Sequence, residues 1–270
     1  MSLRDWLLSL DDRLHFLIVV GSTIITAFVV AFSVQFFFEA LIFDKDVVLV
    51  GVIYQVVGTI YAVLIAFTLL GVWQNFSKAQ LSVQTEAFAL LDLVQIVEAG
   101  KQKNNIREVA LSYLELVTNK EWPTLKKLGP NVVTRHEVSR LASIEMTRAV
   151  QQITPKDARE TAIFNQTLAL LSAWLDARRV RILIAQGNTA KALWPLLLTG
   201  AFFLFSFHGF FIASTNSLWI SLLFGFSVII GLSFYLIFSL DYPFSGNLCV
   251  DANPFRWAIS SLKTYKPQPE

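Results

Sequence analysis

The stretch that decides the fold is residues 47–77, VVLVGVIYQVVGTIYAVLIAFTLLGVWQNFS, which contains no charged side chain. A helix needs about 20 apolar residues to cross the hydrocarbon core of a bilayer. This stretch is longer than that, so we expect a membrane-spanning helix that tilts or continues one or two turns beyond the lipid headgroups.

Similar uncharged runs occupy residues 16–38, 192–213 and 218–240. Together with 47–77 they predict four transmembrane helices in two hairpins. The first run is too long for a signal peptide and lacks a convincing cleavage site, so we expect it to be retained. The 270-residue chain is 54% hydrophobic and only 16% charged, which is typical of an all-α membrane protein rather than a soluble domain.

The composition argues against several other classes of protein. The 22 basic and 20 acidic residues leave a net charge of +2, too small to hold nucleic acid. A single cysteine, Cys249, cannot form an intramolecular disulfide, and three scattered histidines do not suggest a metal site. The sequence contains no phosphate-binding loop, nucleophile elbow or zinc-protease motif. We therefore expect neither an enzyme nor a cofactor.

The distribution of charge predicts the orientation in the membrane. Three acids lie in the connection after the first span: Glu39, Asp44 and Asp46. Three arginines precede the third span: Arg178, Arg179 and Arg181. Because basic residues concentrate on the cytoplasmic side, both termini and the central segment are expected in the cytoplasm of a cell bounded by a plasma or inner membrane. The acids would then ring an outer mouth, and the arginines an inner one.

Five segments follow from this map. We expect an interfacial N-terminal helix at 1–15, a transmembrane hairpin at 16–77, a cytoplasmic helical bundle at 78–191, a second hairpin at 192–240 and a cytoplasmic tail at 241–270. The bundle is inserted between the second and third spans. Its apolar stripes at helical spacing are Val83, Ala87, Leu90, Val94 and Val97; Ile106, Val109, Tyr113 and Val117; Val138, Ala142, Met146, Ala149 and Ile153; and Phe164, Leu168, Leu171, Leu175 and Ile182.

Breaks between the bundle helices are expected at Gly100, at Pro123, at 129–130, and at Thr154, which could cap a helix opened by Pro155. No such break separates Pro155 from residue 187. We therefore expect the last bundle helix to run on toward the third span, just as the second span is expected to run on into the bundle.

The second span has two unlike faces. At about 100° per residue, its small and polar side chains share one sector, which includes Gln55, Thr59, Ala62 and Ala66. Bulky groups such as Val52, Val56 and Val63 occupy the opposite face. The small sector is either a seam for close helix packing or the lining of a water path.

His208 is the only ionisable residue in the middle of a span. Such residues usually face the protein interior or a cavity rather than lipid. Two interpretations of His208 remain open: a neutral, hydrogen-bonded histidine within the bundle, or a functional group.

The end of the fourth span is marked by Tyr242, which precedes a proline and is therefore disfavoured in helical geometry. This leaves Asp241 at the C-terminus of that helix, where a negative charge is unfavourable and needs a partner. The arginines before the third span could supply it.

Several short motifs carry a resemblance to a known family. They are Gly58-Thr59-Ile60-Tyr61-Ala62-Val63-Leu64, Trp73, Glu86, Leu91, Glu121-Trp122-Pro123, Leu193-Trp194-Pro195 and Leu240-Asp241-Tyr242-Pro243-Phe244-Ser245-Gly246. On these residues the chain resembles the bestrophin-like family over nearly its whole length.

The resemblance implies a function. Bestrophins are pentameric ion channels, mostly for chloride, with four spans per subunit, cytoplasmic termini and a pore lined by the second span. The family's calcium-binding run of acids has no counterpart here. The leading hypothesis is a homo-oligomeric channel for small inorganic ions in a lipid bilayer, with anions favoured by the kinship. The alternative is a non-conducting scaffold whose cytoplasmic bundle binds a partner; a transporter ranks third, because no inverted repeat is visible.

Overall fold

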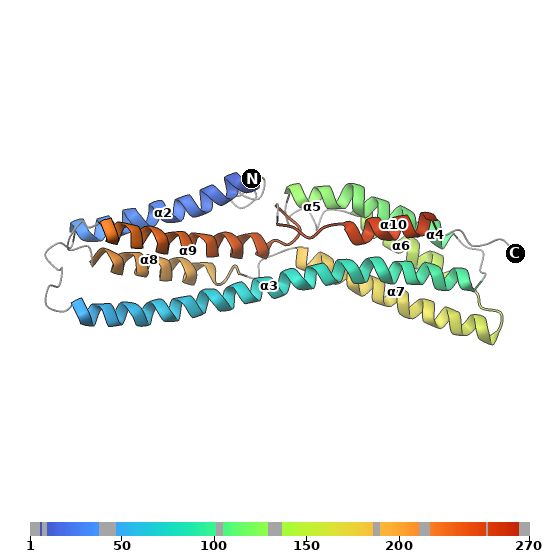
Figure 1. Ribbon diagram of the computed structural model, residues 1–270. Helices are drawn as coiled ribbons and strands as arrows, with labels where there is room; N and C mark the ends of the chain where they lie inside the picture. Colours follow the sequence, from blue (N-terminus) through green and yellow to red (C-terminus); the bar gives the residue numbers. More distant parts are fainter. Residues whose placement is uncertain are drawn as a thin grey trace. The chain divides into compact units, whose positions relative to one another are not determined.

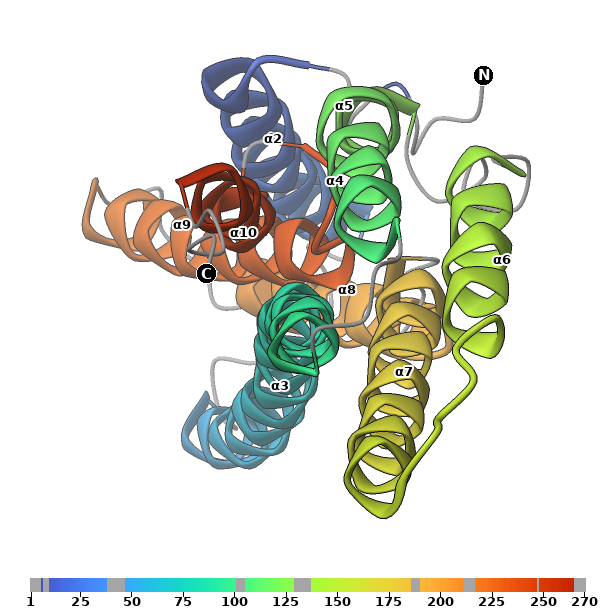
Figure 2. The same ribbon diagram turned by 90° about the vertical axis from the view of Figure 1, so that its right-hand side faces the viewer.

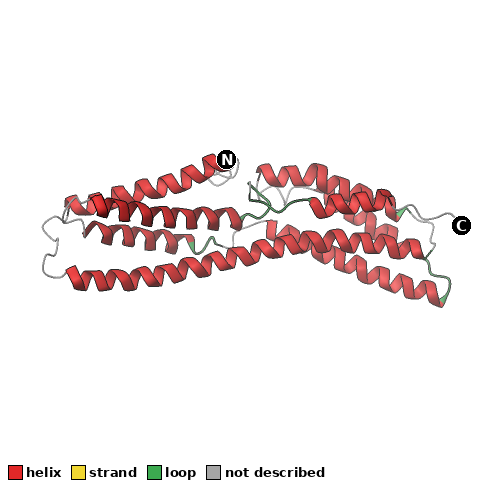
Figure 3. Cartoon of the chain, in the orientation of Figure 1, coloured by secondary structure: helices red, strands yellow, loops and turns green. Residues whose placement is uncertain are grey.

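The computed structural model contains helices joined by turns, and no strand, in the residues that it describes, which are Trp6 and residues 10–37, 47–100, 105–128, 137–185, 190–210, 217–246 and 248–264 (Figure 3). The chain divides into two compact units. Unit 1 comprises residues 1–9, 75–187 and 242–270, and unit 2 comprises residues 10–74 and 188–241. Helix α3 (Val47–Ala99) contributes its first part to unit 2 and its second part to unit 1.

Unit 2 contains the apolar helices. Besides the first part of α3 it holds α2 (Asp12–Phe37), α8 (Trp194–Phe210) and α9 (Ser217–Asp241), with α2 packed against both α8 and α9 (Figure 1). The Tyr235 hydroxyl of α9 donates a hydrogen bond to Asp12 Oδ1 over 2.6 Å, which fixes the first turn of α2. Helix α2 thus begins within the segment expected to be a separate interfacial helix.

Three described helices, α2, α3 and α9, are long and apolar enough to cross a membrane. The fourth expected span is the shorter α8, with 17 residues. At a rise of about 1.5 Å per residue, a helix of this length covers about 25 Å, slightly less than a typical hydrocarbon core. The expected end of that run lies in residues 211–216, outside the described part of the chain.

Unit 1 is a helical bundle around one apolar core. It contains the second part of α3, α4 (Ile106–Leu116), the π-helical turn η2 (Val117–Glu121), α5 (Trp122–Leu128), α6 (Glu137–Gln151), α7 (Ala158–Ala185) and α10 (Asn253–Thr264). Figure 2 shows α3, α4, α6, α7 and α10 in a view turned by 90° from that of Figure 1. The apolar stripe expected from Val83 to Val97 is buried in full in this core.

Residues 106–128 remain helical through Pro123, so the break expected there is wrong. A proline inside a helix lacks an N–H donor, and its ring clashes with the carbonyl four residues earlier. Here the preceding turn is the π-helix η2, in which the backbone N–H of Trp122 donates to the carbonyl of Val117, five residues back. The wider turn lets the chain pass Pro123 without leaving the helix.

Helix α7 differs from its expected bounds at its N-terminal end. It begins at Ala158 rather than at Pro155, because Asp157 Oδ1 accepts the backbone N–H of Glu160 at 2.7 Å, and Glu160 accepts the N–H of Lys156. Asp157 is therefore the N-cap of α7, and Thr154 is not. The helix ends at Ala185, and a turn that starts at Ala190 precedes α8, which begins at Trp194, next to the Pro195 where the third span was expected to take over.

The expected C-terminal tail contains a helix that packs into unit 1. In α10, Phe255, Ala258 and Leu262 are buried in the core. Arg107 connects this helix to its neighbours: its guanidinium donates to both carboxylate oxygens of Glu98, at 2.5 and 2.6 Å, and to the Leu262 carbonyl. At the end of that tail, residues 265–270 lie outside the described chain.

Candidate functional site

In unit 2, helix α3 presents three faces rather than two. Tyr61, Thr68 and Val72 are buried, at 5, 3 and 1% exposure, and lie within about 40° of one another around the helix axis. The expected small sector with Gln55 and Thr59 lies to one side of this buried face and is exposed in the single chain. The bulky sector, in which Val56 is 54% exposed, lies on the other side of the buried face.

The small sector is not a packing seam within the chain. Ala62 and Ala66 are exposed, and a Cβ placed on Gly58 would have Leu204 Cδ2, at 4.0 Å, as its only neighbour within that distance. The Thr59 hydroxyl donates to the Gln55 carbonyl at 2.9 Å, so it is satisfied by its own helix and can still accept a hydrogen bond from water. The contact with another helix falls instead on the buried face.

Tyr61 carries that contact. Its ring lies so close to Gly200 of α8 that a Cβ there would overlap it, and its hydroxyl donates to the Leu197 carbonyl at 2.9 Å. Gly209 is equally constrained, since a Cβ would lie 2.5 Å from the Ala31 carbonyl oxygen of α2. Gly200 and Gly209 could be recognised from sequence as packing residues, but the role of Tyr61 could not.

His208 is 5% exposed and lies among aromatic rings of unit 2. Its ring centroid is 5.6 Å from that of Trp219 and 6.4 Å from that of Tyr54, and its Nε2 is buried without a hydrogen-bond partner among the described residues. The aromatic surrounding places His208 inside the helix bundle of unit 2, and both interpretations of its role stay open.

Asp241 closes α9 and accepts the backbone N–H of Ala190 on Oδ1 at 3.1 Å. Ala190 begins the turn that leads into α8, where its carbonyl accepts the N–H groups of Leu193 and Trp194. The compensation expected for a carboxylate at a helix C-terminus thus includes a backbone donor at the entrance to the neighbouring helix.

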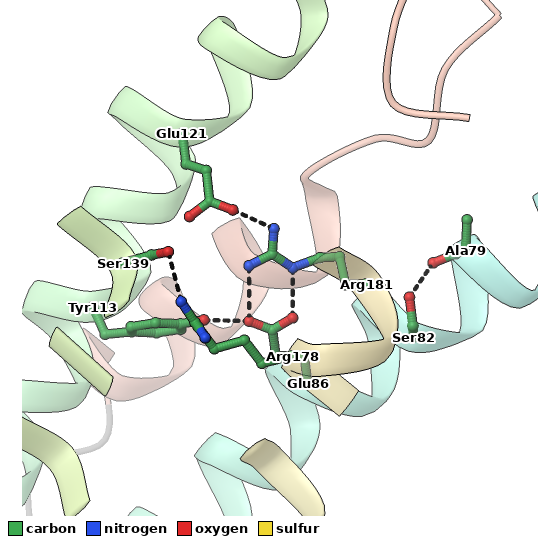
Figure 4. Close-up of polar contacts among 8 residues, drawn as sticks. All are labelled: Ala79, Ser82, Glu86, Tyr113, Glu121, Ser139, Arg178 and Arg181. Atoms are coloured by element: carbon green, nitrogen blue, oxygen red, sulfur yellow. Dashed lines mark hydrogen bonds and ion pairs between the residues drawn. The ribbon is translucent and has the colours of Figure 1, made fainter. Parts of the chain in front are cut away.

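Unit 1 contains a buried ion-pair network centred on Arg181 (Figure 4). The guanidinium donates to Glu86 through Nε (2.6 Å) and Nη2 (3.2 Å), and to Glu121 through Nη1 (2.5 Å). Tyr113 adds a hydrogen bond from its hydroxyl to Glu86 Oε1. The side chains of Arg181 and Glu86 are fully buried. The network therefore joins α3, α4, η2 and α7 through charge-assisted hydrogen bonds.

Arg181 and Glu121 each shift the pKa of the other so that both stay ionised. Burial alone would lower the pKa of Arg181, but the charges of Glu121 and Glu86 outweigh it and raise that pKa well above its usual value. Burial would raise the pKa of Glu121, but Arg181, with Ser139 and Arg178, lowers it. Burial and the Glu86 charge raise the pKa of Tyr113 well above its usual range, so the phenol stays protonated and donates.

Arg181 is therefore not a solvent-facing charge, and its place among the expected inner-mouth arginines is wrong. Its carboxylate partners are Glu86 and Glu121, not Asp241 as the sequence suggested. Arg179 is exposed and pairs with Asp176 over 2.8 Å, whereas Arg178 is half-buried and donates to Ser139 Oγ over 3.0 Å. The expected outer-mouth residues Glu39, Asp44 and Asp46 lie outside the described residues.

The motif around residues 121–123 meets the one around residues 243–246 in unit 1. The Trp122 ring packs edge-on against Phe244 at 5.5 Å, and Ser245 Oγ donates to the Leu125 carbonyl at 3.0 Å. Gly246 has a φ of 75°, which favours glycine over other residues. Two segments that are far apart in the sequence thus form a single contact next to the Arg181 network.

The face that α7 buries was predicted only in part. Leu171 of the expected stripe is buried, and Phe164 and Leu175 are half-buried against the core, but Leu168 is 38% exposed. The buried face also includes Thr167, Trp174 and Arg181. Apolar periodicity could not locate the whole of this face, because its centre carries a charge. Among the described residues no group of His, Cys, Asp and Glu side chains is suited to hold a metal ion.

Comparison with known proteins identifies the family. A family model described as "Bestrophin-like domain" matches residues 20–255. The fold is similar to a bacterial bestrophin homologue from Klebsiella pneumoniae with an isoleucine-to-threonine substitution, with a TM-score of 0.68, 13% identity, and coverage of 92% of this chain and 97% of that one. For a leucine-to-threonine variant of the same homologue the TM-score is 0.64 and the identity 12%, with coverage of 92% of this chain and 98% of that one. No curated protein matches the chain.

Proposed function

The chain belongs to the bestrophin-like family, and from this premise we propose that it forms a pentameric channel for small inorganic anions, with the first part of α3 lining the pore. The observation that carries the proposal is the exposed small sector with Gln55 and Thr59. Polar side chains within a span usually face protein or a water-filled cavity rather than lipid. One chain leaves this sector uncovered, so other copies or water must cover it.

A ring of subunits would cover this sector with other copies of the chain and with water. One subunit's helices are too few to enclose a water path without opening their own core, so conduction requires several copies around an axis. The buried face of α3, with Tyr61, holds the helix against α8 and leaves the adjacent sector available to the axis. The bulky sector with Val56 would then meet lipid or neighbouring subunits.

The proposed topology places residues 1–15, 78–191 and 241–270 in the cytoplasm, at a plasma or inner membrane. Arg178 and Arg179 are the arginines that remain for an inner mouth, and they favour anions. Cysteine labelling in a Cys249-free background tests the orientation. Ser172→Cys, on an exposed position of α7, should react only from inside, and Ser214→Cys only from outside. The reverse pattern would invert the map.

Conduction is tested with purified protein in planar bilayers. Reversal potentials in asymmetric salt should follow the anion gradient. Thr59→Leu, repeated in every subunit, creates a hydrophobic ring able to dewet the passage and should reduce conductance strongly with the oligomer intact. Val56→Leu, on the bulky sector about 60° around the helix from Thr59, is the matched control and should conduct nearly as the parent.

Two results would overturn the channel assignment. Equal effects of the two leucine substitutions would mean that the small sector does not face the ion path. A monodisperse monomer in mild detergent and in nanodiscs would exclude the ring, and the non-conducting scaffold would then take its place.

A further inference from the structure

A groove of about 430 Å³ opens on the surface of unit 1 beside the Arg181 network. Its apolar part is formed by Trp122, Pro123 and Val250. Its polar part includes Lys126, Asp251 and Arg256, all of which are exposed. We refer to it as the Trp122 groove. It joins α5 to the segment that leads into α10, and neither the family resemblance nor the proposed pore accounts for it.

The groove carries unbalanced positive charge. Its one carboxylate, Asp251, is already engaged: Asn253 Nδ2 donates to Oδ2 at 2.6 Å, and Arg256 Nη1 lies 3.5 Å from Oδ1. The Lys126 ammonium has no carboxylate partner among the residues that the structure describes. Two cations and one carboxylate leave a net charge of +1, which selects an anion.

Size and polarity narrow the chemistry of that anion. Pockets for small organic ligands have volumes of about 300–1,000 Å³, a range that includes this groove, whereas an inorganic ion would leave most of it unfilled. An indole and a valine side chain favour an apolar body beside the charge. We propose that the Trp122 groove binds a small organic monocarboxylate, whose carboxylate meets Lys126 and Arg256 and whose apolar part lies against Trp122 and Val250.

Trp122 couples the groove to the buried network. Its ring centroid lies 5.9 Å from Arg181 Cζ and 5.6 Å from the ring of Phe255. A ligand that packs on Trp122 in its present position stabilises the packing around Arg181 by mass action, because it binds the folded unit and not the unfolded chain. Ligand binding should therefore raise the thermal transition of unit 1.

Cys249 provides a direct readout, since it is the only cysteine of the chain and lines the groove half-buried. Burial raises the pKa of its thiol, so alkylation is slow at neutral pH and is best followed above about pH 8. The rate of reaction with N-ethylmaleimide, measured by mass spectrometry on the full-length protein in lipid-free detergent, reports occupancy. The probe is benzoate, and the controls are benzamide and sodium chloride at matched ionic strength.

We expect saturating benzoate to slow alkylation by at least about fivefold, while benzamide and chloride leave it unchanged. Lys126→Ala should abolish this protection, whereas Lys120→Ala, on an exposed position outside the groove, should retain it. Because Lys126 itself lowers the Cys249 pKa, rates are compared with and without benzoate within each variant.

Absence of protection by benzoate would overturn the proposal, as would equal protection by benzamide or chloride, or protection that survives Lys126→Ala. A benzoate-dependent rise of the melting temperature in the parent and in Lys120→Ala, but not in Lys126→Ala, would support it independently. Neither readout requires the protein to conduct, so failure of the proposed channel would leave this test intact.

Discussion

Replacing Arg181 by methionine removes the cation at the centre of the buried network while keeping most of the side-chain volume. Glu86 would keep only the hydroxyl of Tyr113, and Glu121 would lose its one direct arginine bond. Both carboxylates would then lie in the interior without a paired charge. The substitution therefore tests whether the network holds unit 1 together.

The magnitude follows from the bonds that are lost. Three charge-assisted hydrogen bonds at about 1.5–3 kcal/mol each would sum to more than about 4 kcal/mol, but bonds to one guanidinium are not additive. Removing one partner of a buried ion pair costs about 3–5 kcal/mol. For a chain of this size, each kcal/mol shifts the melting temperature by about 2–4 °C, so we expect a decrease of about 6–20 °C.

Intrinsic tryptophan fluorescence during thermal unfolding of the intact protein in detergent measures this decrease. Trp122 and Trp174 report on the network itself, because Arg181 lies over the first ring and Tyr113 packs edge-on against the second at 4.9 Å. The matched control is Arg179→Met on the same helix. The side chain of that arginine is 69% exposed and pairs with Asp176, which is exposed too, so its loss should shift stability by no more than about 0.5 kcal/mol.

A triple variant separates charge from packing. Adding Glu86→Gln and Glu121→Gln to Arg181→Met removes both unpaired carboxylates, and most of the lost stability should return. If Arg181→Met melted within about 2 °C of Arg179→Met, or if the triple variant were no more stable than the single one, the electrostatic account of this core would be refuted.

Three further outcomes are expected. Because the pKa of Glu121 is lowered in the folded protein, its contribution to folding stability is complete above its unfolded pKa of about 4.3 and is lost as the pH falls through the lower folded value. Melting temperatures should therefore decrease below about pH 4. The decrease should be less steep in Glu121→Gln. Gly200→Ala, which forces a methyl group into the Tyr61 ring, should destabilise unit 2 by about 1–3 kcal/mol, while Gly225→Ala, with open space around it, should have little effect on the same thermal transition. Tyr61→Phe, which loses one hydrogen bond to a backbone carbonyl, should cost about 1 kcal/mol by the same measurement.

The sequence was most informative where one physical effect dominated. Long uncharged runs predicted the apolar helices, because burying an unpaired charge in lipid is costly over the whole length of a span. The stripe from Val83 to Val97 predicted the buried face of α3 in unit 1, because its apolar side chains recur at helical spacing. Here every local preference pointed to the same structure.

Helix boundaries were predicted less well where local backbone chemistry competed. Pro123 looks like a break until the π-helical turn before it is known, and no composition rule signals that turn. The start of α7 was readable, since Asp157 and Glu160 have the spacing of a capping box, but the neighbouring Pro155 gave the more obvious signal. Helix α10 was readable too: Asn253-Pro254 opens it, and Phe255, Ala258 and Leu262 have helical spacing.

The buried network could not be predicted from periodicity, and the reason is physical. Amphipathic analysis assigns charged residues to the solvent-exposed face of a helix, so Arg181 was assigned outward and the apolar stripe of α7 inward. In the structure two carboxylates, from α3 and η2, satisfy that arginine, and once its charge is matched its face of α7 can be buried. The information lies in three residues, Glu86, Glu121 and Arg181, whose proximity only the tertiary fold creates. A buried charge is therefore predictable from sequence only together with its partners, which is why the same error would recur in any helix whose inward face is held by ion pairs.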